Sequence, residues 1–182
     1  MAGTTHDPVM EGLAAELARL WRYGLVLSSN RDTAEELVQA TCVRALERSY
    51  QFTAGTRLDR WLLSILHSIW LNELRARKVR RGQGLVDADA VLVFDGIKYT
   101  EMNIWAGQVL REVQALPEAQ RETVYLVYVE GMTYREAAGV LEVPIGTVMS
   151  RLAAARAKLA GLNAPAPLAA AQGGGKRGGS DG

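Results

Sequence analysis

Apolar residues recur at intervals of three and four along the first part of the chain, the spacing that places side chains on one face of an α-helix. The pattern predicts a first helix over about residues 8–30, with Asp7 as its N-cap. It predicts a second helix that runs to about Ser49 and is capped by Asp32 and Glu35, which have the spacing of a capping box.

Residues 50–56 interrupt this pattern, because they carry a glycine and no helical period, and they predict a loop. A third helix is predicted from about Leu58, with Trp61 and Ile69 on its apolar face. This helix continues into the basic stretch RARKVRR at residues 75–81.

A second helical block is predicted from about Asn103. A break at Pro117 separates its first helix from a second helix that ends at Gly131. Thr133 and Glu136 then have the Thr-x-x-Glu spacing of a capping box, which predicts the start of a third, short helix.

The last two predicted helices have the organisation of a helix-turn-helix unit. The short helix stops before Pro144, where a new helix begins. This last helix carries one buried stripe at steps of four, three and four: Val148, Leu152, Ala155 and Leu159. The opposite side stays free for a partner, and in such a unit the second helix lies in the major groove of DNA. A helical hairpin that only closes a core is the alternative interpretation.

Composition limits the classes of protein that fit this pattern. The chain has 182 residues, of which 48% are apolar, enough for one domain or two small helical ones. Its N-terminal segment has no basic start or apolar run, and no stretch approaches the roughly 18 apolar residues of a membrane span. We therefore expect a cytoplasmic protein without membrane insertion.

The residues that could support a metal site or catalysis are few. Cys42 is the single cysteine, and with His6 and His67 it forms no cluster of metal-ligand spacing. We expect Cys42 to be a buried structural thiol, and we expect no metal and no cofactor. No paired carboxylates and no Ser/His/Asp set stand out, so an enzyme is not predicted.

The net charge of +1 conceals two patches of opposite sign. Residues 75–81 carry five basic side chains and no acid, whereas residues 83–104 carry four acids and one lysine. Clustered basic residues on a helix bind phosphates, although a solvated helix end explains so short a run equally well. The segment after Asn163, rich in Pro, Ala and Gly, predicts a disordered tail.

In their order along the chain, these segments resemble the extracytoplasmic-function (ECF) group of bacterial sigma-70 family initiation factors. DTAEELVQATCVRALE, at residues 32–47, resembles the helix of that family that binds core RNA polymerase. Residues 57–81 resemble its promoter-melting and −10-reading helix, and residues 116–159 resemble its −35-reading domain. The resemblance covers about residues 12–160.

The resemblance implies an all-α protein with two small helical domains joined by a flexible acidic linker. The first domain, sigma region 2, is expected at residues 8–81 and the linker at residues 82–104. The second, the sigma region 4 helix-turn-helix, is expected at residues 105–162, followed by the tail at residues 163–182.

The resemblance also implies three groups of binding residues. The group expected to bind core polymerase is Glu35, Glu36 and Gln39. The group expected to bind the −10 element is Phe52, Thr53, Thr56, Asn72, Arg75, Arg77 and Lys78. The group expected to bind the −35 element is Thr147, Met149, Ser150, Arg151, Ala153 and Arg156.

The last helix departs from the family pattern at Met149, Ala153 and Ala154, where basic or bulky DNA-contacting residues are usual. Each missing phosphate contact lowers the log–log salt slope of binding by about 0.9. We therefore expect weak or unusual −35 recognition with a shallow salt dependence. Met149 would offer apolar contact to a thymine methyl group.

The sequence thus predicts a transcription initiation factor that binds core RNA polymerase and promoter DNA and helps to open the duplex by capturing an unstacked base. An anti-sigma factor is an expected partner. A helix-turn-helix regulator that acts without polymerase is the alternative, but it leaves the basic stretch and the acidic segment unexplained. A site-specific recombinase would need a nucleophilic Ser or Tyr in a domain with strands, which the helical pattern does not predict.

Overall fold

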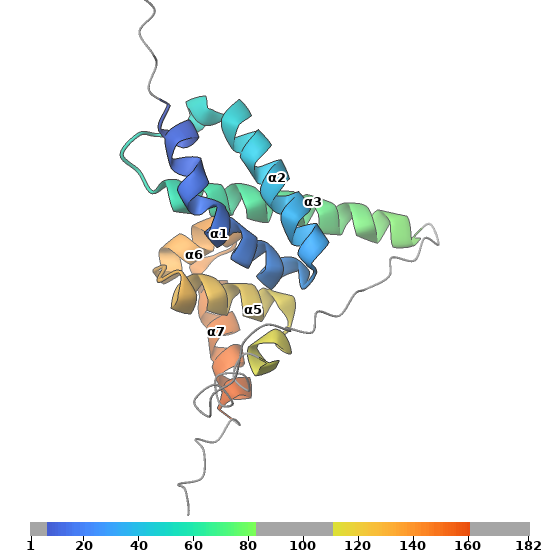
Figure 1. Cartoon of the computed structure of the whole chain (residues 1–182). Coiled ribbons are helices and arrows are strands. Elements are labelled where there is room, and N and C mark those ends of the chain that lie inside the picture. Colours follow the sequence, from blue (N-terminus) through green and yellow to red (C-terminus); the bar gives the residue numbers. More distant parts are fainter. Residues whose placement is uncertain (1–6, 83–110, 161–182) are drawn as a thin grey trace, which may run out of the picture.

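A computed structural model of the chain describes residues 7–82 and 111–160. All of the regular elements in these two ranges are helical, as the sequence predicts (Figure 1). The predicted acidic linker, the start of the second block and the predicted tail lie outside the described residues. The elements are α1 (Pro8–Ser28), α2 (Arg31–Glu47), the 3-10 turn η1 (Ser49–Gln51), α3 (Leu58–Gly82), α5 (Glu118–Val124), the π-helical turn η2 (Tyr125–Val129), α6 (Tyr134–Leu141) and α7 (Ile145–Leu159).

The first two helices begin at different kinds of cap. The Asp7 carboxylate accepts hydrogen bonds from the first N–H groups of α1, as predicted. The predicted capping box of Asp32 and Glu35 is wrong, because Asn30 caps α2 and its Oδ1 accepts from Thr33 N at 2.9 Å. Only two residues join α1 to α2: Ser29, which is left-handed with a φ of 51°, and the cap Asn30, after which α2 begins at Arg31.

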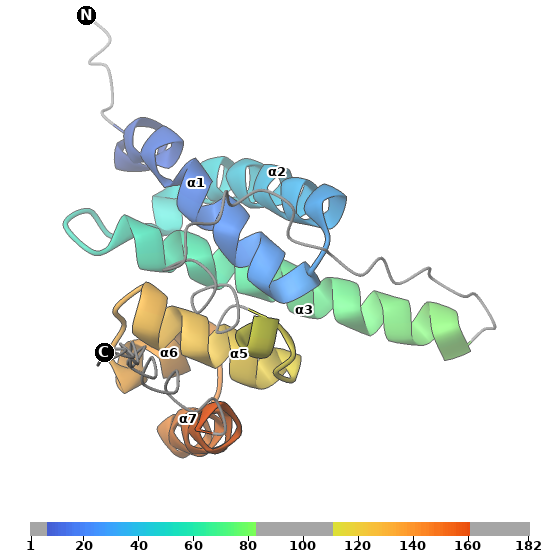
Figure 2. The same ribbon diagram turned by 60° about the horizontal axis from the view of Figure 1, so that its bottom comes forward.

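Helices α1, α2 and α3 pack together as the first block (Figures 1 and 2). Gly24 lets α1 approach α2 closely, because a Cβ atom at this position would lie 3.2 Å from Ala34 Cα. Helix α3 packs along both and, at 25 residues, is the longest element described. Its N-terminal half is buried, and its C-terminal part, which carries the basic stretch, projects beyond the other helices (Figure 2).

The second block ends in the predicted helix-turn-helix. Thr133 and Glu136 form the predicted capping box at the start of α6. The turn between α6 and α7 contains three residues, with Glu142 in the left-handed region at φ 52°, and the two helices are bent by 104°. This angle and turn length are those of helix-turn-helix units. Val148, Leu152 and Ala155 of the predicted stripe are buried, whereas Leu159, near the end of the helix, is half-buried.

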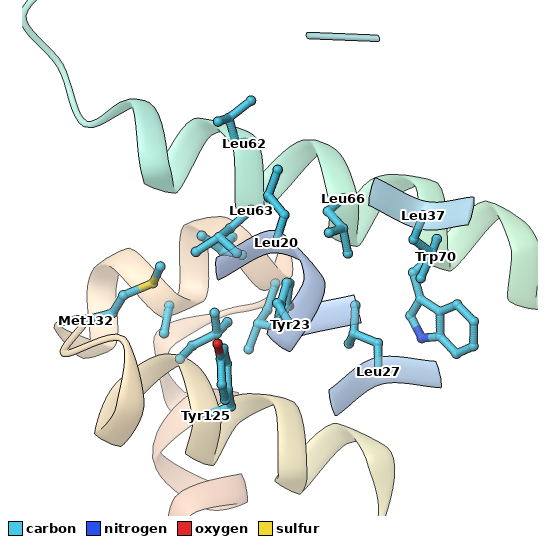
Figure 3. Close-up of a cluster of buried hydrophobic side chains, with 14 of the residues drawn as sticks. Leu20, Tyr23, Leu27, Leu37, Leu62, Leu63, Leu66, Trp70, Tyr125 and Met132 are labelled. Atoms are coloured by element: carbon cyan, nitrogen blue, oxygen red, sulfur yellow. The ribbon is translucent and has the colours of Figure 1, made fainter. Parts of the chain in front are cut away.

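The two blocks share one hydrophobic core (Figure 3). Tyr23 of α1 stacks on Tyr125 of η2 with ring centroids 5.6 Å apart and planes 15° from parallel. Leu66 of α3, and Leu126 and Met132 of the second block, belong to the same buried cluster. The sequence predicts two small domains, and the structure packs the two helical blocks directly against each other.

The length and composition of a helix decide whether it could cross a membrane. Among the described residues, no single helix is both long enough and apolar enough to cross a membrane. Helices α6 and α7 reach the length and apolar composition of a membrane span only when the two are counted as one segment, and they are bent by 104°.

Candidate nucleic-acid and protein-binding surfaces

The outward side of α7 carries most of the residues predicted to read the −35 element. Helix α7 packs on α5 and α6, which lie between it and the first block (Figure 2). Met149 is 53% exposed, and Ser150, Ala153 and Arg156 are also exposed. The Ser150 hydroxyl donates to the Thr147 carbonyl oxygen at 2.9 Å, so it rests against its own helix. The exposed surface is therefore small, weakly charged and apolar at Met149.

Arg151 is half-buried and pairs with a residue of α5 rather than standing free on this outward side. Its Nη1 donates to Glu122 Oε1 at 3.1 Å, and the Glu122 side chain is only 7% exposed. The ion pair fixes α7 on α5 and satisfies a carboxylate that burial would otherwise penalise. Among the predicted −35 residues of the basic type, this leaves Arg156 exposed.

Glu122 belongs to a buried polar cluster at the junction of the two blocks. His67 Nδ1 lies 3.6 Å from Glu122 Oε2 and 3.3 Å from the Tyr23 hydroxyl. Burial, together with the positive charge of Arg151, lowers the pKa of His67 to about 4. Burial raises the pKa of Glu122 to about 7, although the Arg151 charge opposes this rise. His67 is therefore neutral at physiological pH.

The shifted pKa values predict a pH-dependent stability difference for Glu122→Gln. Glu122 binds protons more tightly in the folded chain, so its contribution to stability grows as the pH falls from about 7 toward 4.5. Relative to the wild type, the variant should therefore lose up to about 3 kcal/mol of stability as the pH falls across that window, because glutamine takes up no proton. Urea unfolding of both proteins between pH 4.5 and pH 7.5 measures this.

His67→Gln provides the complementary test. His67 must take up a proton when the chain unfolds, so its stabilising effect is lost as the pH falls from 6.5 toward about 4. Relative to the wild type, His67→Gln should gain stability over that range, which is opposite in sign to Glu122→Gln. Parallel curves for the wild type and both variants would contradict the assigned pKa shifts.

The loop before α3 holds the predicted −10 residues Thr53 and Thr56 at the surface. A tight turn brings the two together, since both the N–H and the hydroxyl of Thr56 donate to the Thr53 carbonyl oxygen. Gly55 makes this turn possible with a φ of +84°, a backbone conformation that favours glycine. Phe52 is half-buried against Trp61, with ring centroids 5.3 Å apart, and this contact anchors the loop on α3.

The remaining −10 candidates lie further along α3. Asn72 and Arg75 are exposed one turn apart, and the guanidinium of Arg75 donates to Asn72 Oδ1 at 2.9 Å. Asn72 lies 14 residues after Leu58, the first residue of α3, which corresponds to about 21 Å of helix. The predicted −10 residues therefore form two patches, one on the loop and one on the distal half of α3.

Part of the basic stretch is neutralised within α3. Glu73 accepts from Arg77 at 3.0 Å and from Arg80 at 2.9 Å, and these partners lower the pKa of the Glu73 carboxyl. The Arg77 guanidinium also lies 5.3 Å from the ring centroid of Trp70. Lys78 is exposed. The positive surface at the end of α3 is thus weaker than the count of basic residues predicts.

The predicted polymerase-binding residues lie on the exposed side of α2. Glu35, Glu36 and Gln39 are all exposed, and neither carboxylate forms an ion pair with a described residue. Glu36 also lines a groove of about 340 Å³ between α2 and α3, and Asn72 lines the opposite side of that groove. The structure therefore brings a predicted polymerase-binding residue and a predicted −10 residue to the same groove.

Two further expectations concern cysteine and metal chemistry. Cys42 is half-buried rather than fully buried, and burial raises the pKa of its thiol. Within the described ranges, no group of His, Cys, Asp and Glu side chains has the geometry of a metal site.

Sequence reasoning misses the polar residues that join the two blocks. Arg121 donates to the main-chain oxygen of Val26, which lies 95 positions earlier in the chain. No local pattern marks Arg121, because a surface arginine in an amphipathic helix has the same spacing. Only the tertiary arrangement shows what such a residue contacts.

Comparisons with known proteins agree with this arrangement of elements. The family model for sigma-70 region 2 matches residues 13–80, and the model for sigma-70 region 4 matches residues 106–159. The chain is 30% identical over 156 residues to the ECF RNA polymerase sigma factor EcfG of Rhodopseudomonas palustris, a match that covers 86% of this chain and 85% of that relative.

The chain belongs to the ECF group of sigma-70 factors. A second relative in this sigma-factor family, SigC of Mycobacterium tuberculosis, is 30% identical over 146 residues, covering 75% of this chain and 73% of that protein. The sigma factor RpoE of Bartonella quintana, solved in complex with the anti-sigma factor NepR, has a TM-score of 0.69 and 27% identity. That match covers 86% of this chain and 97% of the solved chain.

As a sigma factor, this chain is a transcription initiation factor that binds core RNA polymerase and directs it to specific promoters. The alternative of a regulator that acts without polymerase is therefore set aside.

Proposed function

We propose that the sigma factor divides its work between residues 8–81, which bind core polymerase and the −10 element, and residues 105–162, which bind the −35 element. The division follows the matched ranges 13–80 and 106–159, which begin and end inside these limits. The acidic residues 82–104 would then connect the two parts.

The helix-turn-helix geometry carries the assignment of the −35 surface. Helices α6 and α7 meet at 104°, and the outward side of α7 leaves Met149, Ser150 and Arg156 exposed. A helix presented in this way fits the major groove, with its N-terminal half toward base edges. Thr147 and Ala153 complete this surface. Arg151 acts as a positioning residue in this proposal, because it binds Glu122.

The −10 element is assigned to the two patches on and before α3. The exposed loop with Thr53 and Thr56, backed by Phe52, suits the capture of one unstacked base. Asn72 and Arg75 would contact the following nucleotides, while Arg77 and Lys78 add positive charge near phosphates.

Glu35, Glu36 and Gln39 are assigned to core polymerase, since an exposed acidic helix side complements a basic partner. We further propose that this sigma factor catalyses no reaction itself and acts in the cytoplasm. An anti-sigma factor is its proposed inhibitor, because the similar RpoE of Bartonella quintana was solved with one.

Transcription from a library of double-stranded promoters by purified core polymerase tests the proposed function. Start sites should appear only when the sigma factor is added, and their upstream bases should show a −10 and a −35 preference. The variants Thr53→Ala with Thr56→Ala should lose the −10 preference and keep −35 binding. Loss of both preferences together would contradict the proposed division.

Met149→Lys should strengthen binding to the −35 element. The new ammonium group adds one phosphate contact on an exposed position, so the log–log salt slope should steepen by about 0.9. Any preference that depends on contact between Met149 and a thymine methyl group should weaken. Titrations of duplex −35 DNA at several salt concentrations measure both effects.

Val43→Lys is the matched control for this change. Val43 is 56% exposed on α2, so the variant adds the same charge away from α7. An unchanged slope for Met149→Lys, or an equal change for both variants, would contradict the −35 assignment.

A further inference from the structure

The distal half of α3 carries an exposed valine among charged residues. Val79 is 62% exposed, two residues after Arg77 and next to Lys78 and Arg80. A single exposed apolar side chain is common on protein surfaces, so its exposure alone does not indicate a role. Its position relative to the residues that are proposed to bind DNA decides whether it has one.

Val79 lies on the same face of α3 as Asn72 and Arg75. The three residues follow one another at steps of three and four, which is the spacing of neighbouring side chains on one face of a helix. Asn72 and Arg75 are the exposed −10 candidates of this helix, and Arg75 donates to Asn72 Oδ1 at 2.9 Å. Val79 therefore extends the proposed DNA-reading face by about one helical turn.

The other charged side chains of this part of α3 lie beside that face. At 3.6 residues per turn, Glu73, Arg77 and Arg80 lie about 80–140° around the helix from Asn72. Their ion pairs hold one another on that side, with Glu73 accepting from both arginines. Lys78 is exposed about 120° away in the other direction. Basic side chains thus stand on both sides of a face that ends in an apolar side chain.

This end of α3 is accessible to a large partner. It projects beyond the other helices of the described ranges (Figure 2). The major groove of B-DNA is about 12 Å wide and admits an α-helix. Side chains at the edges of such a helix bind phosphates, whereas those on its central face meet the edges of the bases. Lys78 has the edge position here and Val79 the central one.

The spacing along α3 also indicates which base pairs Val79 would meet. Seven residues separate it from Asn72, which corresponds to about 10.5 Å of helix. Base pairs are stacked about 3.4 Å apart, so this length covers two or three of them. Thr53 and Thr56 precede α3, so Val79 lies at the end of the helix far from the proposed base-capturing loop.

We propose that Val79 is a specificity-determining residue that contacts the C5-methyl group of a thymine in paired DNA, two or three base pairs beyond the pair met by Asn72 and away from the captured base. This contact rests on the −10 assignment proposed above. Thymine is the one DNA base with a methyl group at the major-groove edge, so an apolar side chain distinguishes it from the other three. Valine is β-branched and stiff at χ1, so it presents a fixed apolar surface.

Deoxyuridine substitution tests this contact, because it removes only the methyl group of thymine. The DNA is a promoter selected from the library, with thymine and then deoxyuridine placed at each pair around the −10 element on either strand. At one position, deoxyuridine should weaken binding of the polymerase holoenzyme by about three- to fourfold, the effect of exposing one buried methyl group. No such position in the wild type would overturn the proposal.

Val79→Ala should abolish the effect of deoxyuridine at that position. Val43→Ala is the matched control, since Val43 is 56% exposed on α2, and it should leave the deoxyuridine effect unchanged. Both variants change an exposed position, so the fold should be little affected. If Val79→Ala weakened binding equally to the thymine and deoxyuridine promoters, Val79 would contact polymerase or the DNA backbone instead, and the proposal would be overturned.

A change of preference gives a second readout. Val79→Asn replaces the apolar contact by an amide that can pair with adenine in the major groove. Promoters selected with this variant should change from thymine to adenine at the position where deoxyuridine acts, and at no other. An unchanged preference at that position would contradict base contact by residue 79.

Asn72→Ala separates this contact from the assignment on which it rests. A lost or weakened −10 preference in Asn72→Ala supports that assignment, and an unchanged preference contradicts both the assignment and the proposed contact. Where Asn72→Ala weakens the −10 preference but no deoxyuridine position is found, only the contact of Val79 fails.

Discussion

Leu126→Ala is expected to lower the free energy of unfolding by about 2–5 kcal/mol and to destabilise both blocks together. Leu126 is completely buried in the second block, within the cluster that also contains α1 and α3 residues. The cavity should therefore be felt on both sides of the contact. Urea unfolding followed by circular dichroism and by tryptophan fluorescence measures this, with Trp105→Phe as background so that the remaining tryptophans all lie in α1 and α3.

Val129→Ala is the matched control, since Val129 lies one turn away in η2 and is 63% exposed. Its effect should stay within about 0.5 kcal/mol. If Leu126→Ala lowered the midpoint seen by circular dichroism and left the tryptophan midpoint in place, the two blocks would have independent cores.

Glu35→Lys combined with Glu36→Lys should weaken binding to core polymerase by about 100-fold or more. Both residues are exposed on α2, and reversing two charges at a docked surface places like charges together, which costs several kcal/mol. Their exposure also means that the fold should be little affected. Competition with labelled sigma factor for core polymerase measures the affinity, and circular dichroism checks the helix content.

Glu47→Lys is the control on the same helix. Glu47 is the last residue of α2, where a positive charge is compatible with the helix dipole, and it lies outside the proposed polymerase-binding residues. Its affinity should stay within about threefold of the wild type. A similar loss in Glu47→Lys would mean that net charge, rather than the Glu35 and Glu36 positions, governs docking.

Much of the fold follows from local signals in the sequence. Asp7 and the capping box of Thr133 and Glu136 mark helix starts correctly, because each cap depends only on residues a few positions away. The prediction for α2 fails at the same level of detail. Asp32 and Glu35 have the spacing of a capping box. However, Asn30 caps the helix, so α2 begins at Arg31 and Asp32 already lies inside it.

The arrangement of the blocks does not follow from local signals. Tyr23, His67 and Tyr125 have the spacing of ordinary core residues in their own helices, and nothing nearby in the sequence indicates that they meet. The structure also changes the interpretation of Arg151, because its position on α7 predicts an outward side chain, whereas Glu122 of α5 binds it. Both the contact between the blocks and the orientation of Arg151 depend on partners that are distant in the sequence.

The basic stretch illustrates a limit of charge counting. Residues 75–81 count five positive charges, but Glu73 lies one turn before Arg77 and two turns before Arg80, and it pairs with both. Helical spacing makes such pairing foreseeable once the acid just outside the counted stretch is included.

The main-chain hydrogen bonds of Arg121 give the two sides of the contact unequal tolerance to mutation. The acceptors are carbonyl oxygens of Val26 and Leu27, and every amino acid supplies such an oxygen. Position 26 can therefore change among apolar residues without losing the bond, whereas position 121 needs a guanidinium that reaches four oxygens at once. In a saturation library, substitutions at position 121 should therefore remove these hydrogen bonds, whereas substitutions at positions 26 and 27 should keep them. The sequence of α1 can thus change at these positions without a matching change in α5.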